Sequence, residues 1–305
     1  MVDLHTHSNV SDGDLRPELL VRAAAQHGLS AIALTDHDTI NGLEIARKEA
    51  KKLNIHFIPG IEIGINWKKE ASSAGTSRRI SANGEKFPSG ITGMGPGGEF
   101  HLLGLGISRP SPNFIAAINE LFRRRLVRNH NTLQKLKEMG VNAAWEDVQS
   151  LSGGHSVGRL HFAQLLINLK IVKNHKQAFA RYLGAGKPLY IPKEGLIFDE
   201  AVALIRESGG IPVLAHPMSL FVAWGRLPEL IKELKNRGLM GIEAWHPTAR
   251  ASSCKRLSDL GKSLGLFITE GSDYHGSVRP ERTLGYSQRS RKIDDAVLAA
   301  IPELN

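Results

Sequence analysis

Short runs of apolar residues alternate along the chain with stretches whose apolar positions recur every three or four residues. Strand-like runs include "MVDLHTH", "SAIALTDHD" and "IHFIPGIEI", and helical patterns lie between them at "RPELLVRAAAQHG" and "NGLEIARKEAKKLN". Pro17 suits the first turn of the first helix, and Gly28 suits the position just past its end. The same alternation returns at "IPVLAHP", "MGIEAWHP" and "LFITEGSDYHG". A repeated βα unit predicts an α/β protein with a parallel sheet, either closed as a barrel or open.

Two segments interrupt this alternation. Residues 66–99 are rich in Gly, Ser and Lys and have almost no apolar period, so we predict a long, mobile loop there. Residues 113–183 carry helical patterns throughout, and we predict a helical insert that caps the substrate. The α/β body is then formed by residues 1–112 and 184–305.

Composition limits the classes of protein that fit. At 305 residues with 41% hydrophobic residues, the chain can bury a sizeable core in one large domain or two smaller ones. No apolar run is long enough to span a bilayer, the N-terminus does not resemble a signal peptide, and Cys254 is the single cysteine. We therefore expect a cytoplasmic protein with no membrane contact and no obligate protein partner. The net charge of +9 favours an anionic partner such as a nucleotide or nucleic acid.

Histidines and carboxylates follow the predicted strands. His5 and His7 alternate in a strand, so their side chains point to the same face, where they either bind a metal or form an ordinary surface pair. The remaining strand candidates carry further nitrogen and oxygen donors in the same kind of position, and these are Asp12, His37, Glu62, His101, His216, Asp273 and His275. Nine donors exceed what one ion needs, so more than one metal is expected. A set without thiolates suits Mn²⁺, Fe²⁺ or Zn²⁺.

The motifs "DLHTHSNVSDG", "ALTDHDT", "GIEI", "LAHP" and "GSDYHG" resemble those of the PHP (polymerase and histidinol phosphatase) superfamily. The resemblance implies a distorted (β/α)7 barrel with a trinuclear metal site at its C-terminal face, with Mn²⁺ the favoured ion. It assigns the ligands of a first ion as His5, His7, Glu62 and Asp273. It assigns those of a second as Glu62, His101 and His216, with Glu62 bridging. The third ion receives Asp12, His37 and His275.

Within that superfamily, the chain most resembles the branch with a helical insert that hydrolyses phosphate from nucleotides. The resemblance rests on "RRRLVR", "GRLHFA" and "GKPLYIP". It implies that Arg125 and Arg128 grip a substrate phosphate, with Arg159 and His161 as further contacts. Arg125 and Arg128 are three positions apart on a predicted helix, so they share a face, and guanidinium groups match phosphate oxygens. The alternative is a solvated basic helix face.

These features favour a metal-dependent phosphoesterase that removes a phosphate monoester from a 3',5'-bisphosphate nucleotide, such as 3'-phosphoadenosine 5'-phosphate, by attack of metal-bound hydroxide. Three alternatives stay open: a 5'→3' exoribonuclease acting on short 5'-phosphorylated RNA, a histidinol phosphatase, and a non-catalytic PHP interaction module. The general acid is not identified. We also leave open whether Glu243 and His246, in "IEAWHP", line the mouth of the site.

Overall fold

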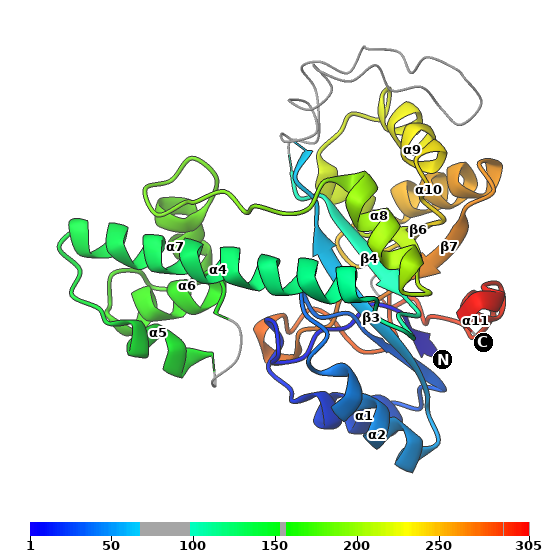
Figure 1. Ribbon diagram of the computed structural model, residues 1–305, viewed down its shortest axis with the longest axis horizontal. Helices are drawn as coiled ribbons and strands as arrows, with labels where there is room; N and C mark the ends of the chain where they lie inside the picture. The colour runs from blue at the N-terminus through cyan, green and yellow to red at the C-terminus, as the bar shows by residue number, and fades with distance from the viewer. Residues whose placement is uncertain (68–97, 153–156, 289, 305) are drawn as a thin grey trace.

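Seven strands form one sheet that curls into a nearly closed barrel. The computed structural model (Figure 1) describes four stretches of the chain, residues 1–67, 98–152, 157–288 and 290–304. The predicted mobile loop at 66–99 therefore lies almost wholly outside the described residues. Strands follow one another in the sheet in chain order: β1 (Val2–Asp3), β2 (Ala31–Leu34), β3 (His56–Gly64), β4 (His101–Leu105), β5 (Ile211–Leu214), β6 (Gly241–Trp245) and β7 (Phe267–Glu270). The expected α/β barrel is confirmed.

The seam of the barrel is closed just beyond β1 and β7. Thr6 forms a parallel bridge with Tyr274. The amide of His7 donates to the carbonyl of Tyr274 at 2.9 Å, and the amide of Asp273 donates to the carbonyl of His5 at 2.9 Å. These bonds join the two ends of the sheet, which are more than 260 residues apart in the chain. They place the first and last polar motifs side by side.

The expectation of a wholly parallel sheet is wrong for β4. This strand pairs antiparallel with both β3 and β5, and Gly64 at the end of β3 faces His101 at the start of β4. His101 therefore precedes its strand's apolar residues, whereas most of the other polar groups follow theirs. Because the strand is reversed, its first residue still lies at the end of the barrel where the parallel strands finish.

Helices cover the outside of the barrel. α1 (Pro17–Gln26) packs beside α2 (Leu43–Leu53), and α8 (Phe198–Glu207), α9 (Leu227–Asn236) and α10 (Ala251–Ser263) follow in the second half of the chain (Figure 1). Pro17 occupies the first turn of α1, as its missing N–H allows, and Gly28 adopts a φ of +75° just past the end. A short α11 (Ala296–Ala299) and a 3₁₀ turn at Pro302–Leu304 follow near the C-terminus.

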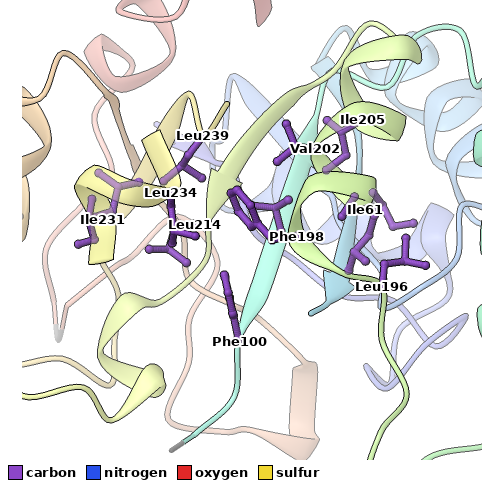
Figure 2. Packing of buried hydrophobic residues seen from close by; sticks show 14 of the residues in the cluster. Ile61, Phe100, Leu196, Phe198, Val202, Ile205, Leu214, Ile231, Leu234 and Leu239 are labelled. Atoms are coloured by element: carbon purple, nitrogen blue, oxygen red, sulfur yellow. The ribbon is translucent and has the colours of Figure 1, made fainter. Parts of the chain in front are cut away.

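The largest apolar cluster lies between the sheet and the helices of the second half. Phe198 of α8 is fully buried and stacks on Phe100 with ring centroids 5.9 Å apart (Figure 2). Leu214 of β5 and Ile231 of α9 belong to the same cluster. A second cluster contains Val2, Ala33, Leu103 and Val213 from four of the strands. Burial of apolar side chains on both faces holds the barrel together.

The helical insert has an apolar cluster of its own. α4 (Pro112–Glu138) runs from the side of the barrel into a group formed by α5 (Trp145–Leu151), α6 (Arg159–Asn168) and α7 (His175–Ala178) (Figure 1). Ser111 caps α4 by accepting a bond from the amide of Phe114 at 3.1 Å. Leu136, Phe162 and Leu183 are among the buried members of this cluster. In the described stretches, no helix is long and apolar enough to cross a membrane.

Candidate metal centre

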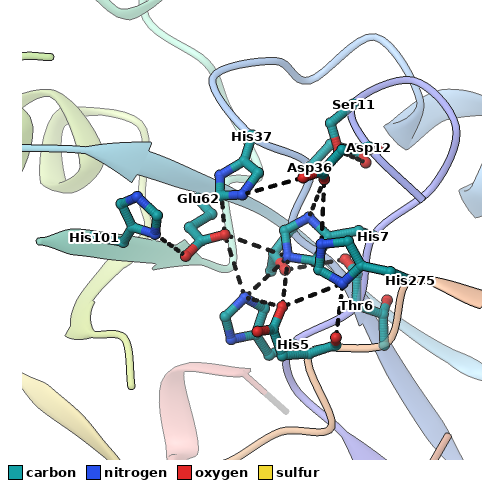
Figure 3. A network of polar contacts seen from close by, with 12 residues as sticks. His5, Thr6, His7, Ser11, Asp12, Asp36, His37, Glu62, His101 and His275 are labelled. Carbon is teal, nitrogen blue, oxygen red and sulfur yellow. Dashed lines mark hydrogen bonds and ion pairs between the residues drawn. The ribbon is translucent and has the colours of Figure 1, made fainter. Parts of the chain in front are cut away.

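Glu62 stands at the centre of a cluster of histidines (Figure 3). It lies on β3, and only 1% of it is exposed. Its Oε1 is 2.7 Å from Nδ1 of His101 and 2.9 Å from Nε2 of His216. Its Oε2 is 3.0 Å from Nδ1 of His37 and within 3.4 Å of the Nε2 atoms of His5 and His7. Burial would raise the pKa of this carboxyl, but the surrounding histidines, led by His37 and His101, hold it well below its usual range.

Asp273 and Asp12 extend the cluster on either side of His7. Oδ1 of Asp273 lies 3.2 Å from Nε2 of His7 and 3.5 Å from Nδ1 of His275. Oδ1 of Asp12 lies 3.3 Å from Nε2 of His275 and 3.8 Å from Nδ1 of His7. Asp273 adopts a φ of +50°, an unusual conformation for a non-glycine residue that is common where a site constrains the backbone. Asp273 and His275 lie close to His7 because the barrel closes between the segments that follow β1 and β7.

All nine residues predicted from the sequence converge on this one region. Their potential ligand atoms form four groups in which every atom lies within 4.8 Å of the others: His7, Asp12, His37 and His275; His5, His7 and Asp273; His5, Glu62 and His216; and His37, Glu62 and His101. Four residues each belong to two groups: His5, His7, His37 and Glu62. The overlap means that neighbouring ions placed in these groups would share ligands.

The chemistry of the cluster fits divalent cations. Nε2 of His5 and Nε2 of His7 face each other at 3.1 Å, and Nδ1 of His7 is buried with no hydrogen-bond partner among the described residues. Burial would lower the pKa of His7, but hydrogen bonds to Asp273 and Glu62 raise it to about 10. Lone pairs of several rings and carboxylates thus converge on a point that attracts positive charge. A cation satisfies such a set, and nitrogen with carboxylate oxygen suits Mn²⁺, Fe²⁺ and Zn²⁺.

Comparison with known proteins identifies the family. The profile of the PHP domain family matches residues 3–185, more than half of the chain. The chain belongs to the PHP domain family. It is 31% identical over 273 residues to a 5'-3' exoribonuclease of Haemophilus influenzae, which covers 90% of this chain and 89% of that protein. It is 28% identical over 294 residues to a 3',5'-nucleoside bisphosphate phosphatase of Chromobacterium violaceum, covering 94% and 91% of the two chains.

The fold of this PHP protein is also found among solved structures. An amidohydrolase from Chromobacterium violaceum, crystallised with bound sulfate and no metal, superposes with a TM-score of 0.78. The two chains are 26% identical, and the match covers 98% of this chain and 96% of that one. The match spans the insert as well as the barrel. The PHP protein therefore shares its whole architecture with a known structure.

A second layer of residues orients the candidate metal ligands of the PHP barrel. Oε1 of Glu243, on β6, lies 2.9 Å from Nδ1 of His5, and its Oε2 accepts the amide of His216 at 2.7 Å. Nε2 of His246 lies 3.1 Å from Oδ2 of Asp273, and Arg282 forms an ion pair with the same carboxylate. The sequence left open whether Glu243 and His246 line the site. It gave no sign of Arg282, which does not directly follow a strand.

Asp36 and Asp38 flank His37, and sequence reasoning missed a role for both. Asp36 is buried and accepts bonds from the amide and hydroxyl of Ser8 at 2.8 and 2.6 Å and from the hydroxyl of Ser11 at 2.6 Å. It thereby fixes the loop between His7 and Asp12. Asp38 is 3% exposed and adopts a φ of +53°. The spacing of the two aspartates in "TDHDT" was a visible signal, since both flank a candidate metal ligand.

Arg125 is held by Asp38. Nη2 of Arg125 lies 2.5 Å from Oδ2 of Asp38, and Nζ of Lys193 lies 2.9 Å from the same oxygen. Burial would raise the pKa of Asp38, but Lys193 and Arg125 hold it well below its usual range. The predicted phosphate-binding arginine is therefore already paired and nearly buried, with 10% of its side chain exposed. The pairing fixes the orientation of its guanidinium group.

Arg128 and Arg159 lie near Arg125. Among the described residues, the guanidinium of Arg128 has no hydrogen bond and no ion pair. Burial, together with the positive charges of Arg125 and Arg159, lowers the pKa of Arg128 to about 10. Arg159, at the start of α6, is paired with Glu99 at 2.9 Å. Nδ1 of His161 accepts a hydrogen bond from the amide of Gly158 at 2.9 Å, so this ring nitrogen caps α6.

Proposed function

We propose that the protein hydrolyses a phosphate monoester of a nucleotide that carries a second phosphate, as in a 3',5'-bisphosphate nucleotide. The broader conclusion, a metal-dependent hydrolase of phosphate esters, rests on membership of the PHP family together with the cluster of nitrogen and carboxylate donors. The two relatives described above are named for a bisphosphate nucleotide and for RNA. We assign a substrate with a second phosphate because of the arginines beside the cluster.

The nine clustered residues would hold the ions. We assign His5, His7, Glu62 and Asp273 to one, Glu62, His101 and His216 to a second, and Asp12, His37 and His275 to a third, with Mn²⁺ as the favoured metal. Bound divalent ions would supply activation of water and neutralisation of phosphoryl charge. The protein's own part is to fix these ligands, through the seam of the barrel and through Glu243 and Asp36. No side chain is assigned as the general acid.

The guanidinium of Arg128, which pairs with no described residue, is the observation that carries the choice of substrate. A partly buried cation flanked by Arg125 and Arg159 is unfavourable unless an anion joins it. A phosphate group satisfies several guanidinium groups at once through charge-assisted bonds. We therefore assign Arg125, Arg128, Arg159 and His161 to the phosphate that is not cleaved, and residues 113–183 to a cap that presents them.

Turnover by the Mn²⁺-loaded protein distinguishes the candidate functions. The test compares kcat/KM for 3'-phosphoadenosine 5'-phosphate, a short 5'-phosphorylated RNA and histidinol phosphate. We expect the bisphosphate to be the best of the three. A higher value for RNA would assign the exoribonuclease function instead, and a higher value for histidinol phosphate would assign that phosphatase. No turnover of any of them, with less than one metal per chain, would indicate a non-catalytic module.

Arg128→Ala tests the role of the arginine separately from the metal chemistry. A charge-assisted hydrogen bond contributes about 1.5–3 kcal/mol, so kcat/KM for the bisphosphate should fall by roughly 10- to 150-fold. Turnover of p-nitrophenyl phosphate should change little, because it has no second phosphate. Lys137→Ala, an exposed residue on the same helix, is the matched control. Equal losses on both substrates would instead place Arg128 at the phosphate that is cleaved.

A further inference from the structure

A basic groove lies beside the proposed phosphate site. It runs between α4 and residues 191–194 and has a volume of about 190 Å³. Its charged lining comprises two carboxylates, Asp38 and Glu194, and five cations. The cations are Arg123, Arg124, Arg125, Arg128 and Lys193. We call this the α4 groove. None of the nine proposed metal ligands lines it in the described part of the chain, so it is distinct from the metal centre.

Existing ion pairs leave the α4 groove with an excess of positive charge. Glu120, on the same helix, lies 2.7 Å from Nε of Arg123 and 2.8 Å from Nε of Arg124, and this one carboxylate is shared by two cations. Asp38 is likewise shared by Arg125 and Lys193. The pairs made by Glu120 are exposed to water and contribute little, so the guanidinium groups of Arg123 and Arg124 remain good partners for a further anion. The groove therefore suits an anionic ligand.

The α4 groove begins where the phosphate that is not cleaved is proposed to bind. Arg125 and Arg128 belong both to that phosphate site and to the lining of the groove. Asp38, which also lines the groove, directly follows His37 of the candidate metal cluster. A ligand that enters the groove can therefore be part of the same substrate, extended from the held phosphate away from the metal donors.

Size restricts what that extension can be. Sites that enclose a whole drug-sized ligand measure roughly 300–1,000 Å³, and the α4 groove is smaller. The groove is too small to enclose a further nucleotide. If the held phosphate is the terminal phosphate of an RNA, no further nucleotide extends from it into the groove. One or two phosphate groups joined to the held phosphate by anhydride bonds satisfy both the volume and the charge.

We propose that the α4 groove binds a polyphosphate extension of the substrate, so that the preferred substrates are nucleotides with a phosphate monoester at one end and a di- or triphosphate at the other. This inference rests on the proposed function, because it uses the same held phosphate. Arg124 and Lys193 are the residues that distinguish it, since the proposed function assigns no role to either.

Paired substrates test the inference. The Mn²⁺-loaded wild type should show a kcat/KM about tenfold higher for guanosine 3'-phosphate 5'-diphosphate than for guanosine 3',5'-bisphosphate, the low end for one charge-assisted hydrogen bond. Arg124→Gln and, separately, Lys193→Gln should remove most of this preference. Lys137→Gln, on the same helix outside the groove, should keep it. A wild-type ratio near one, or a ratio that both groove variants leave intact, would overturn the inference.

Binding of inorganic pyrophosphate separates the groove from catalysis. Calorimetry on the metal-loaded protein should show pyrophosphate binding about tenfold more weakly to Arg124→Gln than to Lys137→Gln, while binding of orthophosphate differs little between the two. Should the wild type hydrolyse neither guanosine nucleotide, the proposed function fails, and this measurement decides the groove alone. Equal pyrophosphate affinity in the two variants would then overturn the groove as well.

Discussion

Replacing Glu243 by glutamine should weaken metal binding without unfolding the protein. The carboxylate accepts from two groups at once, Nδ1 of His5 at 2.9 Å and the amide of His216 at 2.7 Å. While Nδ1 of His5 donates to it, Nε2 of that ring keeps a lone pair directed at Glu62 and His7. Both oxygens of Glu243 must therefore accept a hydrogen bond to orient two of the proposed ligands, His5 and His216.

A glutamine side chain at position 243 satisfies only one of these bonds. If its oxygen accepts the amide of His216, its NH₂ group faces His5, whose proton must then move to Nε2 and block the ligand atom. If the amide is turned round, its NH₂ group meets the N–H of His216. Losing one charge-assisted bond costs about 1.5–3 kcal/mol, which predicts a roughly 10- to 150-fold rise in the Kd for Mn²⁺. Partners of this kind typically change metal affinity by about 10- to 100-fold.

Competition with a chelator measures that Kd directly, and elemental analysis counts the ions retained. Glu270→Gln is the matched control, because Glu270 is equally buried on the neighbouring strand but binds Ser287 and Arg291 instead of a proposed ligand. At saturating Mn²⁺, Glu243→Gln should recover most of the wild-type kcat. Equal metal affinities in the two variants, at comparable Tm, would refute the positioning role.

Three shorter predictions follow from buried groups. Asp273→Asn should abolish phosphatase activity and release at least one ion, measured by elemental analysis, while circular dichroism shows an intact fold. Asp38→Asn should lower the free energy of unfolding by about 1.5–3 kcal/mol at pH 7, because Arg125 and Lys193 lose their shared charged partner. The folded-state pKa of Asp38 is depressed, so this difference should be complete above about pH 4 and shrink as the pH falls through the lower, folded-state value. Phe198→Ala should cost about 3–5 kcal/mol in denaturant unfolding, whereas a loss below 1 kcal/mol would contradict the packing in Figure 2.

Local signals in the sequence were enough to predict an α/β fold and the nine candidate metal ligands, and the resemblance to the PHP superfamily added the barrel. Apolar periods of two and of three to four residues depend on which side chains a strand or helix buries, and that is a property of neighbours in the chain. Parallel strands bring their ends to one edge, so donors placed after successive strands are expected to converge. His5, Glu62 and Asp273 lie together for that reason.

Contacts between distant segments were decided by the tertiary structure alone. The reversal of β4 depends on its pairing with β3 and β5, and nothing in "HLLGL" records a direction. Glu243 reaches His5 across 238 positions of sequence, and Arg125 reaches Asp38 across 87. Glutamate and arginine are common on protein surfaces, so their composition gives no sign of a buried partner. Only the closed barrel and the docked helix α4 bring these charges out of water and fix what each one orients.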